Sequence, residues 1–255
     1  MKKNLFLSAV VLILAAGGVR TLQAADAPKM EPAKAAAPAK KAASVKADPA
    51  KKVEADKAKS GPTDPKTLLA PEKAVEKAPD VFRVKFATTK GEFVIEARRD
   101  WAPNGVDRFY NLVKLGYFDG VSFFRVVKGF MVQFGIHGTP EVNAAWRSAR
   151  IMDDPVKNTN ARGTVTYAMA GPNTRTTQLF INYGNNAALD GQGFPPFGQV
   201  VKGMEVVEKL YDGYGDMPDF GGRCPDQGRM QNEGDPYLKK DFAKLDYVKT
   251  ARLAK

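Results

Sequence analysis

The sequence contains few of the reactive side chains, cysteine and histidine, on which many enzyme active sites depend. Among its 255 residues there is a single cysteine, Cys224, and a single histidine, His137. One cysteine excludes a disulfide within the chain, so Cys224 is either a free thiol, inert and partly buried, or a link to another molecule. One Cys and one His cannot supply the four ligands of a structural zinc site, and a Cys–His or Ser–His mechanism would depend on His137 alone. We therefore expect no metal and no other cofactor, and we place His137 in a surface loop.

The sequence also lacks a long hydrophobic run. Its longest apolar stretch extends from Leu5 to about Ala16, short of the roughly 20 residues that a spanning helix needs. Lys2 and Lys3 precede this stretch, and small residues follow at 24–25, which is the pattern of a signal peptide over residues 1–25. The alternative is an uncleaved membrane anchor. The pattern predicts a periplasmic or secreted protein whose mature chain has no membrane span.

Residues 26–80 contain no aromatic residue and consist largely of Ala, Lys and Pro. Such a segment cannot bury enough apolar surface to offset the entropy of ordering it, so we expect a disordered linker. The formal charge of +11 is spread along the whole chain rather than gathered in one basic block, so we expect no nucleic-acid binding.

Residues 81–255 have the patterns of one mainly β domain, which we expect to be a monomer. Alternating apolar and polar residues predict a hairpin over 81–97, and apolar residues spaced three and four apart predict a short helix within 101–116. The remaining patterns predict strands within 121–127, 130–135, 163–170, 177–184, 197–201 and 245–253, and a second helix over 203–212. Many short strands without β-α-β alternation favour a closed antiparallel barrel with helical covers. The loop 212–222 does not fit the calcium-loop spacing, and we expect a plain surface loop.

One stretch of this domain, SFFRVVKGFMVQFG (122–135), places Arg125 among apolar residues. A guanidinium stays charged, so burying it unpaired is very costly. Either Arg125 is an ordinary strand residue that faces water, or an apolar pocket holds it for a purpose. The stretch belongs to the block FDGVSFFRVVKGFMVQFG (118–135), and a second block, 163–207, contains AGPNTRTTQLFI.

With these two blocks the sequence resembles the cyclophilin family of peptidyl-prolyl cis-trans isomerases, over nearly all of residues 81–255. The resemblance implies an eight-stranded antiparallel β-barrel with two capping α-helices, and an outer groove that binds proline-containing peptides. It implies that Arg125 is the catalytic arginine and that Gln133 assists it. The substrate-binding residues that it implies are Phe130, Met131, Ala168, Met169, Gln178, Phe180, Leu189 and Phe194.

The sequence departs from the family pattern at the rim of this implied site. Phe124 stands where the family usually has histidine, and Ala188 stands where many eukaryotic members have tryptophan. Met169 replaces an asparagine that binds substrate through its backbone, a contact that would survive the change. Phe194 lies near the usual place of a pocket histidine. The changes affect the rim, whereas the implied catalytic groups are kept.

Isomerisation of an X–Pro bond breaks no covalent bond, so it needs no nucleophile, metal or proton shuttle. It needs a charged donor that stabilises the twisted amide inside a dry pocket, and Arg125 suits this role. On this hypothesis the partner of Arg125 arrives with the substrate. We expect the clients to be unfolded or partly folded exported proteins. The alternatives are a non-catalytic module that binds proline peptides or acts as a chaperone tethered to the envelope, and a protein whose tail is the functional part.

Overall fold

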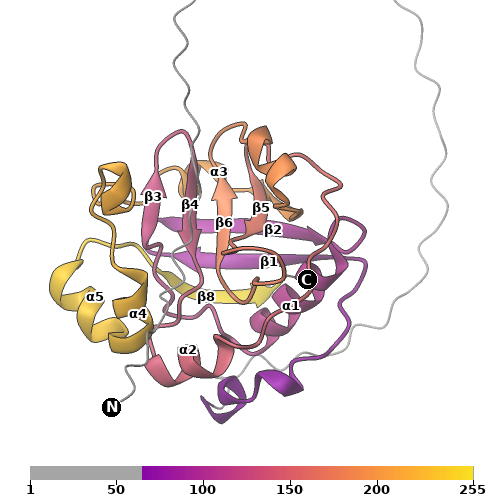
Figure 1. Ribbon diagram of the computed structural model, residues 1–255, viewed down its shortest axis with the longest axis horizontal. Coiled ribbons are helices and arrows are strands. Elements are labelled where there is room, and N and C mark those ends of the chain that lie inside the picture. Colours follow the sequence, from indigo (N-terminus) through magenta and orange to yellow (C-terminus); the bar gives the residue numbers. More distant parts are fainter. Residues whose placement is uncertain (1–64, 255) are drawn as a thin grey trace, which may run out of the picture. The chain divides into compact units, whose positions relative to one another are not determined.

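The computed structural model describes residues 65–254, which are built around one sheet of eight antiparallel strands (Figure 1). The strand order is β3-β4-β6-β5-β7-β2-β1-β8, so the prediction of eight antiparallel strands is confirmed. The strands are β1 (Val81–Thr88), β2 (Gly91–Arg98), β3 (Arg125–Val127), β4 (Met131–Phe134), β5 (Thr164–Tyr167), β6 (Leu179–Asn182), β7 (Pro196–Lys202) and β8 (Val248–Leu253).

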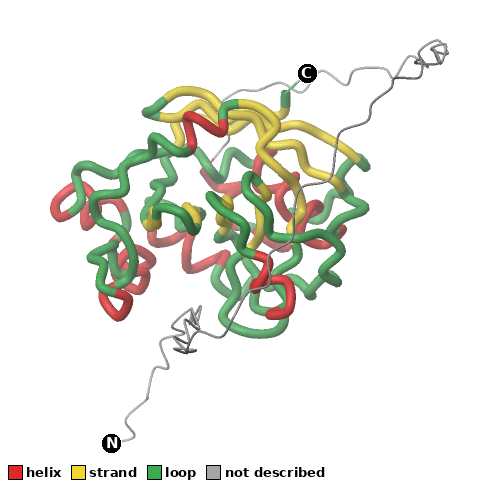
Figure 2. Tube along the Cα trace, turned by 90° about the horizontal axis from the view of Figure 1, so that it is seen from above, coloured by secondary structure: helices red, strands yellow, loops and turns green. Residues whose placement is uncertain are grey.

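The two edge strands, β3 and β8, do not form a ladder with each other, but the segment before β3 is joined to the start of β8 and the residues before it. Ser122 and Tyr247 form an isolated antiparallel bridge. The amide of Phe123 donates to the carbonyl of Asp246, and the amide of Val248 donates to the carbonyl of Val121, both at 2.9 Å. The sheet therefore curls round (Figure 2), and main-chain hydrogen bonds beside the edge strands connect its two ends.

The helices outnumber the two that the sequence predicts. The described residues form α1 (Pro103–Lys114), α2 (Pro140–Trp146), α3 (Met204–Val207), α4 (Gln227–Glu233) and α5 (Asp235–Asp241). The predicted helices correspond to α1 and to α3, which is much shorter than the predicted 203–212. The other three have at most seven residues, too few to show a clear helical period. Local contacts support α4: the Asp226 side chain caps it, and Arg229 and Glu233 pair four residues apart.

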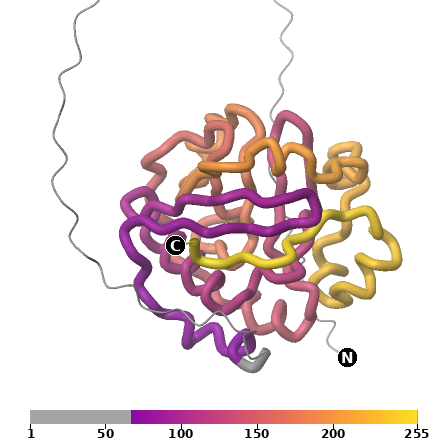
Figure 3. Tube along the Cα trace, turned by 180° about the vertical axis from the view of Figure 1, so that it is seen from behind, coloured from indigo at the N-terminus to yellow at the C-terminus, as the bar shows by residue number. Residues whose placement is uncertain are grey.

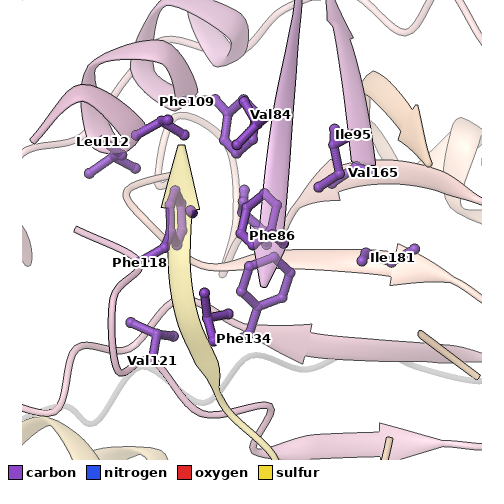
Figure 4. Close-up of a cluster of buried hydrophobic side chains, with 14 of the residues drawn as sticks. Val84, Phe86, Ile95, Phe109, Leu112, Phe118, Val121, Phe134, Val165 and Ile181 are labelled. Atoms are coloured by element: carbon purple, nitrogen blue, oxygen red, sulfur yellow. The ribbon is translucent and has the colours of Figure 1, made fainter. Parts of the chain in front are cut away.

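The core lies inside the curled sheet and is rich in phenylalanine (Figure 4). The rings of Phe86 and Phe93 stack with centroids 5.0 Å apart, and the edge of Phe134 meets Phe86 at 6.1 Å. Phe109 of α1 lies 5.0 Å from the ring of Phe197 in β7, so this helix closes one end of the core. Each fully buried Phe contributes about 1.5–3 kcal/mol of apolar burial, which is why these short strands hold together.

Residues 65–80 are packed against the domain, which corrects the predicted boundary between 80 and 81. They include the 3₁₀ helices η1 (Pro65–Leu69) and η2 (Pro71–Lys73), and η1 packs on α2. Leu68 is buried in the core, and its carbonyl accepts a 2.7 Å hydrogen bond from the indole of Trp146. Figure 3 shows this indigo segment against the neighbouring helices. Two buried apolar residues, Leu68 and Ala78, and a few hydrogen bonds order a segment whose composition predicts disorder.

The predicted signal peptide and the linker up to residue 64 lie outside the described residues. Within residues 65–254, no helix is both long enough and apolar enough to cross a bilayer.

Candidate functional site

The site is built on a row of residues that crosses four neighbouring strands. The sheet register pairs Arg125 of β3 with Gln133 of β4, Gln133 with Phe180 of β6, and Phe180 with Thr166 of β5. Successive side chains of a strand point to opposite faces. The next row (Val126, Val132, Ile181 and Val165) belongs to the core. The row that contains Arg125 therefore occupies the outer face of the sheet, as the resemblance implies.

Arg125 is almost completely buried, with 1% of its surface exposed, and two of its three nitrogens are held by the protein. Its Nη1 donates to Gln133 Oε1 at 3.1 Å, and Gln133 Nε2 donates to Gln178 Oε1 at 2.9 Å. Its Nε donates to Asp216 Oδ1 at 2.7 Å. Nη2 makes no hydrogen bond to the residues between 65 and 254. The guanidinium thus keeps one nitrogen, Nη2, for an additional acceptor.

Asp216 is a partner of Arg125 that sequence reasoning missed, and it corrects two expectations. Arg125 was expected to lack a partner until substrate arrives, and 212–222 was expected to be a plain surface loop. The loop instead pairs Arg125 and is tightly folded: the Cys224 amide donates to the Asp216 carbonyl at 2.9 Å. A Cβ at Gly222 would lie 2.0 Å from the same carbonyl, so only glycine fits there. These glycines and the acidic residue were visible in the sequence, but their spacing does not indicate which distant residue the loop contacts.

The predicted apolar residues gather beside this row. Met131, Phe180, Leu189 and Phe194 are at most 5% exposed, and none of them belongs to the main core cluster. The rings of Phe180 and Phe194 meet edge to face at 6.0 Å. Leu189 lies in the 3₁₀ helix η3 (Ala187–Gln192), and its carbonyl accepts from the Phe194 amide at 3.2 Å.

Four predicted residues lie at the margin of this apolar group. Phe130, Met169 and Gln178 are half-buried. Ala168 is buried, and its amide donates to the carbonyl of Gln178 at 3.0 Å. The Phe130 carbonyl accepts from the Tyr183 amide at 2.8 Å, which ties the turn after β3 to the end of β6. All ten predicted site residues thus come from strands β3, β4 and β6 or from the segments that directly adjoin β4, β5, β6 and β7.

Phe124, which stands in place of the family's histidine, points away from the polar row. It is 1% exposed and belongs to a second hydrophobic cluster with Ile136, Met230, Tyr237 and Leu238. Three of these partners come from α4 and α5, which lie together beside β3 (Figure 1). An apolar ring suits this environment, where an imidazole would leave polar nitrogens without partners.

The other reactive side chains of the described residues, His137 and Cys224, do not form a second candidate active site. His137 is half-buried, its pKa is lowered by burial, and its Nδ1 accepts from the amide of Thr139 at 3.0 Å. Burial raises the pKa of the Cys224 thiol to about 11. The described residues contain no group of three or more His, Cys, Asp or Glu side chains that could hold a metal. Two surface hollows flank the segment 67–76 beside α1, away from Arg125.

Comparisons with known proteins identify the family of the chain. The family model described as cyclophilin type peptidyl-prolyl cis-trans isomerase/CLD matches residues 83–225. The chain is similar to peptidyl-prolyl cis-trans isomerase CYP18-1 of Arabidopsis thaliana, with 37% identity over 53% of this chain and 88% of the relative. It is 33% identical to peptidyl-prolyl cis-trans isomerase B of Escherichia coli, over 50% of this chain and 82% of the relative.

A solved structure supports the fold alone. The crystal structure of a cyclophilin type isomerase from Cryptosporidium parvum superposes with a TM-score of 0.51 and 20% identity. The superposition covers 69% of this chain and 98% of that one. The family match ends at residue 225, just before α4, so α4 and α5 lie beyond the matched region.

Proposed function

Since the chain belongs to the cyclophilin-type peptidyl-prolyl cis-trans isomerase family, we propose that it accelerates X–Pro bond rotation during the folding of proteins exported from the cytoplasm. The isomerase activity is that of the family. The client class is supported by the signal-peptide pattern of residues 1–25, with its basic start and short apolar run.

The observation that carries the proposal is the environment of Arg125. Rotation about a peptide bond must cross a barrier of about 18–20 kcal/mol, because the nitrogen lone pair is shared with the carbonyl. A donor that hydrogen-bonds the prolyl nitrogen in the twisted state favours the localised lone pair. Arg125 is charged, buried and held at Nε and Nη1, so Nη2 is the nitrogen that we expect to donate to the prolyl nitrogen. Hydrogen bonds from charged donors are strong, and they strengthen where water is excluded.

The apolar residues beside Arg125 supply the other requirement, a surface that holds the proline ring while the rest of the peptide turns. Met131, Phe180, Leu189 and Phe194 form an apolar group beside Arg125, and their side chains carry no competing hydrogen-bond groups. Gln178 is half-buried at the end of the Arg125–Gln133 hydrogen-bond chain, which supports the proposal that it contacts the substrate backbone. The proposed substrates are accordingly proline-containing segments of unfolded or partly folded chains.

The test is prolyl isomerisation of short X–Pro peptides by the parent protein and by Arg125→Ala. Loss of one preorganised donor should lower the rate by about 10²–10³-fold, while affinity for a proline peptide falls much less because the apolar residues remain. Arg162→Ala is the control, since Arg162 is exposed and pairs with Glu208 away from the row. A parent that binds proline peptides without accelerating their isomerisation would favour a non-catalytic binding module.

The export part of the proposal has its own test. The protein should be recovered from the periplasm or medium of the producing cell, with its N-terminus near residue 25. Recovery of the uncleaved chain from the cytoplasm would contradict this part and leave the isomerase activity untouched.

A further inference from the structure

We propose that the segment 212–245 positions Arg125 for catalysis and that Asp216 is the positioning residue through which it acts. The proposal rests on the proposed isomerase function. It concerns residues that the arginine motif itself does not contain, because Asp216 lies 91 positions after Arg125.

The first support is the geometry of the guanidinium. Gln133 holds Nη1 and Asp216 holds Nε, so two edges of the planar group are bound and its plane cannot rotate without breaking a hydrogen bond. Asp216 is an anion beside a cation with 1% of its surface exposed, and a buried cation needs such compensation. The two contacts leave Nη2 without a hydrogen-bond partner among residues 65–254.

The second support is that Asp216 is itself held in place. Its Oδ1 also accepts the Met217 amide at 2.7 Å, and its carbonyl accepts the Cys224 amide at 2.9 Å. Only 18% of its side chain is exposed. A carboxylate fixed by its own loop can fix the group that it binds, whereas a freely moving surface carboxylate could not.

The third support is a separate contact of the same segment with the residue beside Arg125. Phe124 is buried against Met230 of α4 and Leu238 of α5, and its amide donates to the carbonyl of Gln133 at 3.2 Å. The segment 212–245 therefore contacts two consecutive residues where β3 begins, the ring of Phe124 and the guanidinium of Arg125. Figure 1 shows the same segment running beside β3.

The geometry indicates that Asp216 positions Arg125 for the reaction and does not inhibit it. An inhibitory latch would occupy the nitrogen that the substrate needs, but Asp216 takes Nε and leaves Nη2 without a partner among residues 65–254. Removing Asp216 should therefore slow the reaction, because a donor displaced by about 1 Å can cost up to 10²-fold in rate.

The experiment measures kcat and KM on X–Pro peptides with the full mature chain and three variants. Asp216→Ala should lower kcat by about 10–100-fold with KM nearly unchanged. Asp216→Asn should recover only part of that loss, because its amide oxygen can still accept from Nε but no longer compensates the buried charge. Asp219→Ala is the matched control, because Asp219 lies exposed in the same loop, and it should behave like the parent.

A double-mutant cycle and one spectroscopic signal test whether Asp216 acts through Arg125. In an Arg125→Ala background, Asp216→Ala should change kcat little, because the group that it positions is gone. In the otherwise native protein, Asp216→Ala should shift the Nε–Hε resonance of Arg125 and speed its hydrogen exchange, while Asp219→Ala leaves both unchanged.

Three results would overturn the proposal. The first is a kcat of Asp216→Ala equal to or above that of the parent. The second is a variant in which only KM changes. The third is an equal loss of kcat on Asp216→Ala with and without Arg125. An inactive parent would overturn both this proposal and the proposed function, whereas an active parent with an equally active Asp216→Ala would overturn this proposal alone.

Discussion

Leu68 provides a sharp test of whether residues 65–80 belong to the folded domain. Its side chain is 9% exposed and joins the core cluster, while the adjacent Leu69 is 49% exposed. Leu→Ala at buried positions costs about 2–5 kcal/mol. Leu68 is the most exposed member of the core cluster, at 9%, so we expect about 2 kcal/mol for Leu68→Ala, the low end of this range. Leu69→Ala should stay within about 0.5 kcal/mol of the parent.

The assay is thermal unfolding followed by circular dichroism. For a domain of this size, 1 kcal/mol shifts Tm by about 2–4 °C, so Leu68→Ala should melt about 4–8 °C below the parent and Leu69→Ala almost with it. Emission of Trp146 gives a second readout, because its indole donates to the Leu68 carbonyl and moves into water if the segment detaches. Equal Tm values for the two variants would refute the packing of η1 and restore the boundary at residue 81.

Three further predictions concern side chains that are buried or half-buried. Burial lowers the pKa of His137 below its ordinary 6.5, so the unfolded chain binds more protons and stability should fall as the pH drops below about 6.5. In urea titrations, His137→Gln should lose less unfolding free energy than the parent over that pH range. An equal dependence of the unfolding free energy on pH in the two proteins would contradict this. Because burial raises the pKa of Cys224 to about 11, roughly one thiol in a thousand is ionised at pH 8. A thiol reagent should therefore label the native protein far more slowly than the unfolded one, and comparable rates would show that the thiol is accessible. Phe124→Ala should lower the free energy of unfolding by about 3–5 kcal/mol, since it removes a fully buried ring from the cluster with Met230 and Leu238; a loss below about 1 kcal/mol would argue against that packing.

The sequence by itself determined the framework of the sheet. Alternating apolar residues over 81–97 predicted the hairpin of β1 and β2, and helical spacing predicted α1. These patterns are local, because a strand or helix shows its buried face within a few residues. The motif around Arg125 likewise contains Gln133, since both lie on one hairpin, where the register pairs them directly.

Only the tertiary structure decided what surrounds that hairpin. The composition of residues 65–80 predicts disorder, yet burial of Leu68 and a hydrogen bond from Trp146, 78 positions away, hold the segment in place. The short helices α4 and α5 become stable against Phe124, which nothing in their own sequence reveals. Asp216 meets Arg125 across 91 positions. In each case the stabilising contact joins groups that are distant in the chain, so its free energy depends on the folded geometry and leaves no local periodicity in the sequence.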